Sequence, residues 1–288
     1  MNVSFGSLMT SKPLFSVIVP TCYRNDLLAK CLDRLAPGAQ SLSADKYEVI
    51  VTDDGSEITA EQMISEQYGW AKWIAGPSSG PAANRNHGAR FAKGEWLAFS
   101  DDDCIPDPQW LEAYANAILS EPTCYVFEGR VYTDRPRKSL AEVSPIFETG
   151  GYLPSGNFVC RKDIFESLGG FDERFPYPAM EDVEFRLRLK RAGYSFSFIR
   201  EASVCHPWRP KGGWKKLKQH QQSTLIYLSI HPEEKSRINT FYYFRITLNN
   251  LIKVTIPGCI KFKGKGMKES FLDHLASLQM ALILIKRR

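Results

Sequence analysis

The sequence lacks most of the marks of exported, membrane-spanning or disulfide-rich proteins. Its seven cysteines include no C-x-x-C pair, which is typical of reduced thiols in a cytosolic protein rather than of a disulfide framework. The first residues have neither the basic start nor the long apolar core of a signal peptide. No apolar stretch reaches the ~20 residues that cross a bilayer. We therefore predict a cytoplasmic protein without a transmembrane helix.

Acidic and basic residues are distributed unevenly along the 288 residues. Residues 1–206 contain 21 Lys and Arg against 28 Asp and Glu, whereas residues 207–288 contain 16 against 4. Such a change of sign indicates two functional regions. The acidic region suits a site that uses a metal, and the basic region suits an anionic partner, either a membrane surface or a phosphate-rich molecule.

Short apolar runs alternate with helical patterns over the first hundred residues. This alternation predicts an α/β fold with a mostly parallel sheet flanked by helices. Ligands of such sheets bind at the carboxyl ends of the strands. We expect strands at 14–20, 47–56, 72–76 and 95–100, and helices at 25–38, 59–68 and 81–94.

Three consecutive aspartates, Asp101, Asp102 and Asp103, follow the last of these predicted strands. Adjacent carboxylates repel each other, so a cation is expected to neutralise them. Carboxylate oxygens suit the hard ions Mg²⁺ and Mn²⁺. An EF-hand is excluded, because Ile105 and Pro106 occupy the positions of an oxygen ligand and the turn glycine. The alternative is a solvated acidic turn that caps the next helix.

Four segments, in this order, resemble the motifs of family 2 glycosyltransferases with the GT-A fold: SVIVPTCYRND, VIVTDDGS, GPAANRNHGARFAKGEWLAFSDDDCIPDPQWL and EDVEFRLRLKRAG. The resemblance extends from about residue 14 to 210. It implies a Rossmann-like GT-A sheet and a sugar transferred with inversion from a nucleotide-sugar donor, with Mn²⁺ or Mg²⁺ as cofactor. We accordingly expect a flexible leader (1–12), a catalytic domain (13–210) with nucleotide-binding (13–105) and acceptor-binding (106–210) halves, and a basic amphipathic helical extension (211–288).

The resemblance also implies which side chains hold the donor. Asp53 corresponds to an aspartate that accepts a hydrogen bond from the pyrimidine N3–H, which favours uracil or thymine over cytosine and therefore a UDP- or dTDP-linked sugar. Tyr23 is expected to stack on the base and Arg24 to reach the phosphates. The full predicted nucleotide-binding set is Pro20, Thr21, Tyr23, Arg24, Asp53, Arg85, Asp101 and Asp102.

The remaining site residues are also implied by the resemblance. The metal is expected on Asp101, Asp103 and His206, although a lone histidine is more often structural. Asp182 is expected to be the base that takes the proton of the acceptor hydroxyl. Glu181 and Asn157 are expected to bind the acceptor. Alternatively, Glu181 and Asp182 only cap a helix, and Asn157 is a turn residue.

The basic region interleaves Trp208 and Trp214 with lysine and arginine, as at a lipid–water interface or on single-stranded nucleic acid. We expect no nucleic acid partner. These helices either dock peripherally on an anionic membrane, at the inner face of the cytoplasmic membrane, or pack on the catalytic domain or a second subunit. The sequence does not decide whether the chain forms an oligomer. A glycan or lipid-linked acceptor of bacterial envelope or exported glycan synthesis would suit membrane docking.

Two other functions compete with this one. A sugar-phosphate nucleotidyltransferase needs a glycine-rich phosphate loop after its first strand, and the segment PTCYRND contains no glycine. A non-catalytic relative that binds nucleotide-sugar or glycan would be indicated by loss of Asp103 or Asp182, and both are present.

Overall fold

The computed structural model describes residues 12–286, so the predicted leader lies outside the described residues except for Lys12. The strands are β1 (Phe15–Thr21), β2 (Tyr47–Asp53), β3 (Lys72–Ala75), β4 (Trp96–Ser100), β5 (Ile105–Pro106), β6 (Val126–Tyr132), β7 (Glu142–Val143), β8 (Asn157–Arg161), β9 (Ser197–Cys205) and β10 (Arg209–Pro210). The α-helices are α1 (Asn25–Leu35), α2 (Glu61–Gln67), α3 (Pro81–Arg90), α4 (Trp110–Ser120), α5 (Lys162–Ser167), α6 (Glu181–Arg191), α7 (Gly213–Ile230), α8 (Thr240–Asn250), α9 (Ile256–Lys261) and α10 (Met267–Lys286). Short turns of other helix types are η1 (Ala44–Lys46), η2 (Pro232–Ser236) and η3 (Leu251–Thr255).

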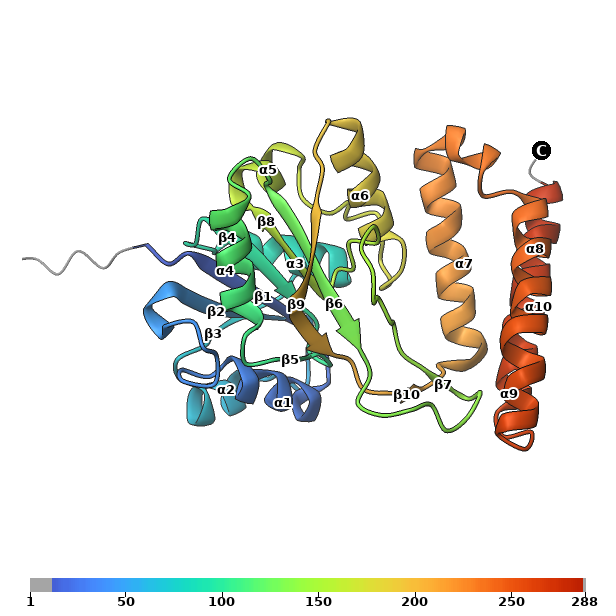
Figure 1. The fold of residues 1–288 in the computed structure, drawn as a ribbon, viewed down its shortest axis with the longest axis horizontal. Coiled ribbons are helices and arrows are strands. Elements are labelled where there is room, and N and C mark those ends of the chain that lie inside the picture. Colours follow the sequence, from blue (N-terminus) through green and yellow to red (C-terminus); the bar gives the residue numbers. More distant parts are fainter. Residues whose placement is uncertain (1–11, 287–288) are drawn as a thin grey trace, which may run out of the picture.

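One mixed sheet organises the catalytic region (Figure 1). Its strand order is β3-β2-β1-β4-β8-β6-β9-β5. The strands β3, β2, β1 and β4 are parallel, β8 is antiparallel to both of its neighbours, and β9 is parallel to β6. This arrangement confirms the predicted α/β fold, and it extends the sheet through both expected halves of the domain.

Alternating side chains bury both faces of the sheet. Val17 and Val49 belong to a core covered by α1, α2 and α4, whereas Ile18, Ile50 and Phe99 belong to a second core covered by α3, α5 and α6. Successive residues of a strand point to opposite faces, so apolar runs without polar interruptions are required here. The layering leaves the strand ends as the place for polar chemistry.

The segment 135–156, which its Pro, Gly and Ser content predicts to be a mobile loop, is anchored at several points. Its β7 pairs with β10, with Val143 opposite Arg209. The buried carboxylate of Glu128 accepts backbone hydrogen bonds from Tyr152 (3.0 Å) and Leu153 (2.6 Å). A buried carboxylate that is satisfied by backbone amides fixes the local chain path.

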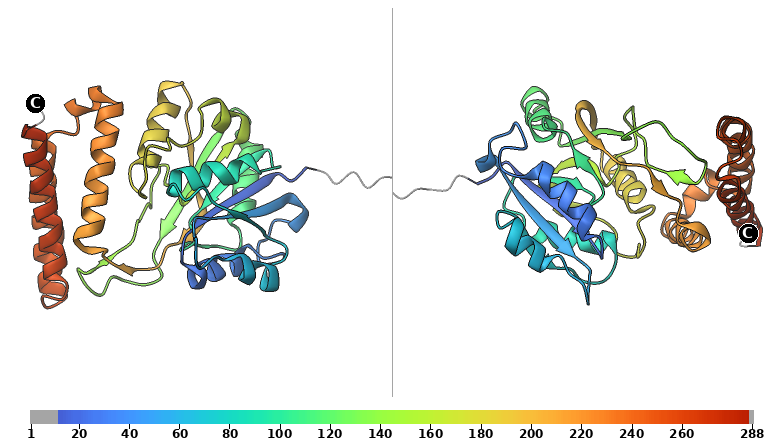
Figure 2. Two further views of the ribbon diagram at one scale, coloured as in Figure 1. Left: turned by 180° about the vertical axis from the view of Figure 1, so that it is seen from behind. Right: turned by 90° about the horizontal axis from the view of Figure 1, so that it is seen from below.

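The basic extension is helical, as predicted, and forms two layers beyond the sheet. α7 stands between the sheet and a hairpin made of α8, η3, α9 and α10, as both views in Figure 2 show. α10 contacts both α7 and α8. Within residues 12–286, no helix has the length and apolar content required to span a membrane.

Candidate active site

Three parallel strands bring polar residues to one edge of the sheet. Thr21 at the end of β1 pairs with Asp53 at the end of β2, and the acidic triplet follows β4. The α3 helix lies close to the same strands because Gly88 has no side chain, and a Cβ there would come within 2.8 Å of Ile18 Cγ2. The edge predicted from the sequence is therefore formed.

Asp102 is directed into the protein. Its side chain is fully buried, it accepts a hydrogen bond from Thr21 Oγ1 (2.7 Å), and it forms an ion pair with Arg24 Nη2 (2.5 Å). Burial, together with the neighbouring carboxylates, raises the pKa of Asp102 to about 7. The positive charge of Arg24 acts in the opposite direction. Asp102 therefore positions Thr21 and Arg24, and its expected direct contact with the nucleotide is not supported by this geometry.

Asp103 meets a cluster of cationic groups. His206 Nε2 lies 3.3 Å from Asp103 Oδ1, while Arg24 Nη1 (3.0 Å) and Arg209 Nη1 contact the other oxygen. Burial would raise the pKa of Asp103, but the hydrogen bond from His206 and the charges of His206, Arg209 and Arg24 outweigh it and hold this pKa well below its ordinary value. The carboxylate is thus kept ionised.

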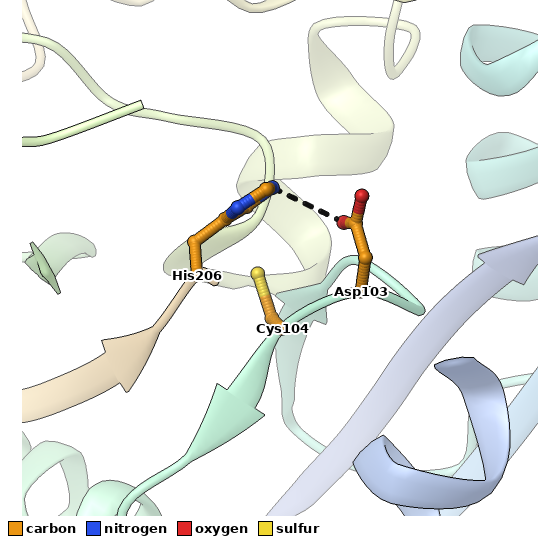
Figure 3. A group of neighbouring side chains, drawn as sticks. All are labelled: Asp103, Cys104 and His206. Atoms are coloured by element: carbon orange, nitrogen blue, oxygen red, sulfur yellow. Dashed lines mark ion pairs between the residues drawn. The ribbon is translucent and has the colours of Figure 1, made fainter. Parts of the chain in front are cut away.

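These two side chains fit the divalent ion implied by the resemblance. Figure 3 shows Asp103 and His206 pointing toward each other, with Cys104 beside them. His206 Nδ1 lies 3.2 Å from both Ser144 Oγ and Pro207 O, so Nδ1–H donation to that carbonyl leaves Nε2 as a ligand. Burial raises the pKa of the Cys104 thiol well above its ordinary value, and a neutral thiol does not suit a hard cation.

Arg85 joins the donor edge to the predicted base motif. It is almost completely buried, with Nη2 2.5 Å from Asp101 Oδ1 and Nη1 3.2 Å from Glu181 Oε1. Asp101 therefore turns toward Arg85, while Asp103 and His206 form the candidate metal pair. Within residues 12–286, Arg85 Nε and Glu181 Oε2 are buried without a hydrogen-bond partner. Such orphaned atoms are uncommon in folded proteins and often mark functional sites.

Asp182 lies in the first turn of α6, beside this bridge. Its Oδ1 accepts a hydrogen bond from the Val183 backbone amide (2.7 Å), and its side chain is only partly buried. Desolvation raises the pKa of Asp182, and it raises that of Glu181 to about 7, with a further increase from the neighbouring carboxylate. A carboxylate with a raised pKa is a stronger proton acceptor.

Two side chains that were expected to contact a ligand form hydrogen bonds inside the protein instead. Asn157 is fully buried and uses all its hydrogen-bonding positions inside the protein. Its oxygen accepts from Trp110 and Tyr114 (2.7 Å each), and its nitrogen donates to the carbonyls of Arg130 and Ala202 (2.9 Å each). It has no capacity left for an acceptor, so its position reflects packing.

The second of these side chains is Asp53. This side chain is 2% exposed, and its oxygens accept from the backbone amides of Gly55 (2.8 Å) and Ala60 (2.6 Å). Asp53 thus closes the turn after β2. Its neighbour Asp54 is more exposed and accepts from Ser78 (2.9 Å) and Gly80 (3.1 Å), with one lone-pair position left on each oxygen.

The remaining expected nucleotide contacts differ in exposure. Tyr23 is 53% exposed, and its hydroxyl lies 2.6 Å from Ser56 Oγ, so its ring lies at the surface of this edge. Pro20 is buried within β1 opposite Thr52, where it supports the edge rather than lining it.

Three further residues near the site come from the basic region 207–288, and the motif pattern did not indicate them. Arg209 contacts Asp103, as described above. On α7, desolvation lowers the pKa of Lys216 and the nearby charges of Arg209 and Arg24 lower it further. His220 lies one turn later on α7. Desolvation lowers the pKa of His220, and the negative charge of the nearby Asp182 opposes this shift.

Comparison with known proteins settles the family. The family model "Glycosyl transferase family 2" matches residues 16–171. The chain belongs to this family. Its members transfer sugars, so the chain is a glycosyltransferase, and the resemblance stated from the motifs is confirmed. The match rules against a nucleotidyltransferase.

Several characterised proteins are similar to this chain over part or most of their length. The chain is 30% identical over 220 residues to glycosyltransferase AglE of Haloferax volcanii, covering 71% of this chain and 70% of that protein. It is 26% identical over 241 residues to chondroitin synthase of Escherichia coli, covering 68% of this chain but only 35% of that protein. The crystal structure of S. aureus TarS 1–349 has a TM-score of 0.53 at 18% identity, covering 95% of this chain and 81% of that chain, which supports the fold alone.

Proposed function

We propose that this glycosyltransferase moves a sugar from a UDP- or dTDP-linked donor to a hydroxyl of a glycan or lipid-linked acceptor, with inversion and with a divalent metal. The observation that carries the proposal is the bridge made by Arg85. It contacts Asp101 of the donor edge (2.5 Å) and Glu181 of the base motif (3.2 Å). One guanidinium would therefore hold the donor edge and the base motif at a fixed separation, as an inverting displacement requires.

The diphosphate of the donor would lie against Asp103, His206 and the surrounding cations. We propose that Asp103 and His206 hold Mn²⁺ or Mg²⁺, which supplies neutralisation of the negative charge that develops on the leaving nucleoside diphosphate. Arg24 contacts Asp102 and Asp103, Arg209 contacts Asp103, and Lys216 lies near both guanidinium groups, so three cations face two carboxylates. This surplus of positive charge favours a multiply charged anion. The planar guanidinium groups also match the geometry of phosphate oxygens.

The acceptor would enter beside Asp182. Its carboxylate takes the hydroxyl proton, the resulting oxygen attacks the anomeric carbon, and the bond from that carbon to the diphosphate oxygen breaks. The raised pKa of Asp182 supports this role. Glu181, with one orphaned oxygen, and His220 on α7 are the proposed acceptor contacts.

The nucleoside would occupy the outer part of the edge. The exposed Tyr23 ring offers a stacking surface. We propose that Asp54, rather than Asp53, accepts the pyrimidine N3–H, since Asp54 is partly exposed whereas Asp53 is buried and its Oδ2 also faces Trp73 Nε1 (3.4 Å).

The acceptor and the cellular location are proposed only as broad classes. Relatives of this chain include a chondroitin synthase and a hyaluronan synthase, which supports a glycan acceptor. We propose a role in envelope or exported glycan synthesis, at the inner face of the cytoplasmic membrane.

A panel of nucleoside diphosphates with and without Mn²⁺ tests this proposal. We expect UDP or dTDP to raise the melting temperature only when Mn²⁺ is present, and slow hydrolysis of the matching nucleotide-sugar without acceptor. Equal stabilisation by CDP, or by UDP in the absence of metal, would contradict the site. Stabilisation without any hydrolysis or transfer would indicate a non-catalytic binding protein.

A further inference from the structure

The C-terminal hairpin, residues 240–286, carries most of the exposed apolar surface of the described chain. Of 21 large hydrophobic side chains that are exposed within residues 12–286, 13 lie between residues 241 and 285. The α8 helix has no buried residue at all, and Phe241 is 74% exposed. Soluble monomers rarely expose contiguous apolar patches of this kind without an interaction partner.

These side chains follow helical spacing. Recurrence every three or four residues places side chains on one face of a helix. Each arm of the hairpin therefore presents an apolar stripe. The first stripe is Phe241, Phe244, Leu248, Ile252, Ile256 and Ile260, and the second is Met267, Phe271, Leu275, Leu282 and Ile285.

The hairpin is also strongly basic. Residues 240–286 contain seven Lys and Arg but only two acidic residues. The turn between α9 and α10, together with the helix ends that flank it, has the sequence KFKGKGMK (261–268), in which Lys261, Lys263, Lys265 and Lys268 are all exposed. Lysine beside exposed apolar side chains matches the interface of a bilayer, where the chains snorkel toward the headgroups.

From this surface we propose that the hairpin docks on an anionic lipid bilayer, with its apolar stripes in the headgroup region and the lysines of its turn against lipid phosphates. A second copy of the chain is a poorer occupant, because two hairpins of the same positive charge would repel each other. An anionic surface satisfies the apolar and the basic parts together.

The place of the hairpin in the molecule gives this docking a consequence for the active site. α10 packs on α7, and α7 carries Lys216 and His220. Figure 1 shows α7 between the hairpin and the sheet. A docked hairpin therefore brings the active site close to the membrane surface. This docking goes beyond the proposed reaction, because it depends on neither the donor nor the metal.

Vesicle sedimentation with the full chain, without substrate or metal, tests the proposal. We expect stronger binding to vesicles of phosphatidylcholine mixed with phosphatidylglycerol than to phosphatidylcholine alone, and weaker binding at high salt. The double variant Lys263→Glu and Lys265→Glu should weaken binding at least about 25-fold, since each lysine near an anionic surface contributes roughly fivefold. The double variant Ile260→Ser and Phe271→Ser should weaken binding at low and high salt alike.

Matched controls come from exposed residues outside the hairpin, Lys30→Glu for charge and Leu119→Ser (80% exposed) for apolar surface. Both should bind vesicles as the unchanged chain does. Absence of vesicle binding, or equal binding by the hairpin and control variants, would overturn the proposal. A dimer in light scattering that only the hairpin variants dissociate would assign this face to a second copy instead. Donor hydrolysis in solution should be the same in all four variants, which separates this test from that of the proposed reaction.

Discussion

His206 Nε2 lies 3.3 Å from Asp103 Oδ1, although His206 directly follows β9 and Asp103 lies in the turn after β4. The fold therefore brings together an imidazole and an ionised carboxylate at the edge where the parallel strands end. A carboxylate and an imidazole are both ligand types that would hold a divalent ion at this edge. This pair is the basis of the metal proposal.

Replacing Asp103 with Asn should abolish metal binding. The variant keeps the size of the side chain but removes the negative charge that favours a hard cation. Electron paramagnetic resonance of Mn²⁺ measures the bound fraction directly, without any turnover. Asp163→Asn, an exposed carboxylate paired with Arg161 at 2.6 Å, is the control and should bind Mn²⁺ as the unchanged chain does. Full Mn²⁺ binding by Asp103→Asn would remove this residue from the metal site.

Replacing Asp182 with Asn should separate donor binding from transfer. The amide cannot take a proton from the acceptor, so kcat should fall about a hundred- to ten-thousand-fold. The dissociation constant for UDP with Mn²⁺ should stay within about twofold, because the hydrogen-bond partner of Asp182 within residues 12–286 is the Val183 amide and not a proposed diphosphate contact. Single-turnover assays and calorimetry measure the two quantities. Unchanged turnover would mean that another group acts as base.

Replacing Arg85 with Met should destabilise the fold itself. The change leaves Glu181 buried without its cationic partner, and breaking a buried pair costs about 3–5 kcal/mol. Urea unfolding measures this loss. The control Arg90→Met removes an exposed pair with Glu173 and should cost at most about 1 kcal/mol. Equal losses of unfolding free energy in the two variants would show that the Arg85 bridge stabilises the fold no more than an exposed ion pair does.

The raised pKa of Glu181 predicts a pH dependence of stability. Folding raises this pKa from 4.5 to about 7, so between these values the folded state holds more protons than the unfolded state and the free energy of unfolding falls as pH rises. The variant Glu181→Gln cannot titrate. The difference in unfolding free energy between it and the unchanged chain should therefore vary across this range. A difference that is constant with pH would contradict the raised pKa.

The sequence predicted the fold well because local patterns determined it. The apolar runs of β1, β2 and β4, separated by helical segments, required a parallel sheet with a polar edge, and the acidic triplet identified that edge. The antiparallel β8 and the late return of β9 to the sheet depend on long-range pairing, which local spacing does not encode.

The candidate site was predictable only in part. Spacing placed Asp53 and Asp54 at a strand end, but adjacent carboxylates point in different directions, and only the structure shows that Asp53 closes the turn. Asn157 matched a motif position, yet its four internal hydrogen bonds depend on Trp110, Tyr114, Arg130 and Ala202, which are distant in sequence. Lys216 and His220 reach the site only because α7 packs on the catalytic region, with Tyr227 and Leu228 in the second core.

The most direct test of the central claim is a crystal structure of the chain with UDP and Mn²⁺. The account predicts an anomalous Mn²⁺ peak bonded to Asp103 and His206, with the pyrophosphate beside it and in contact with Arg209 or Lys216. A pyrophosphate bound away from residues 101–103 would contradict the account.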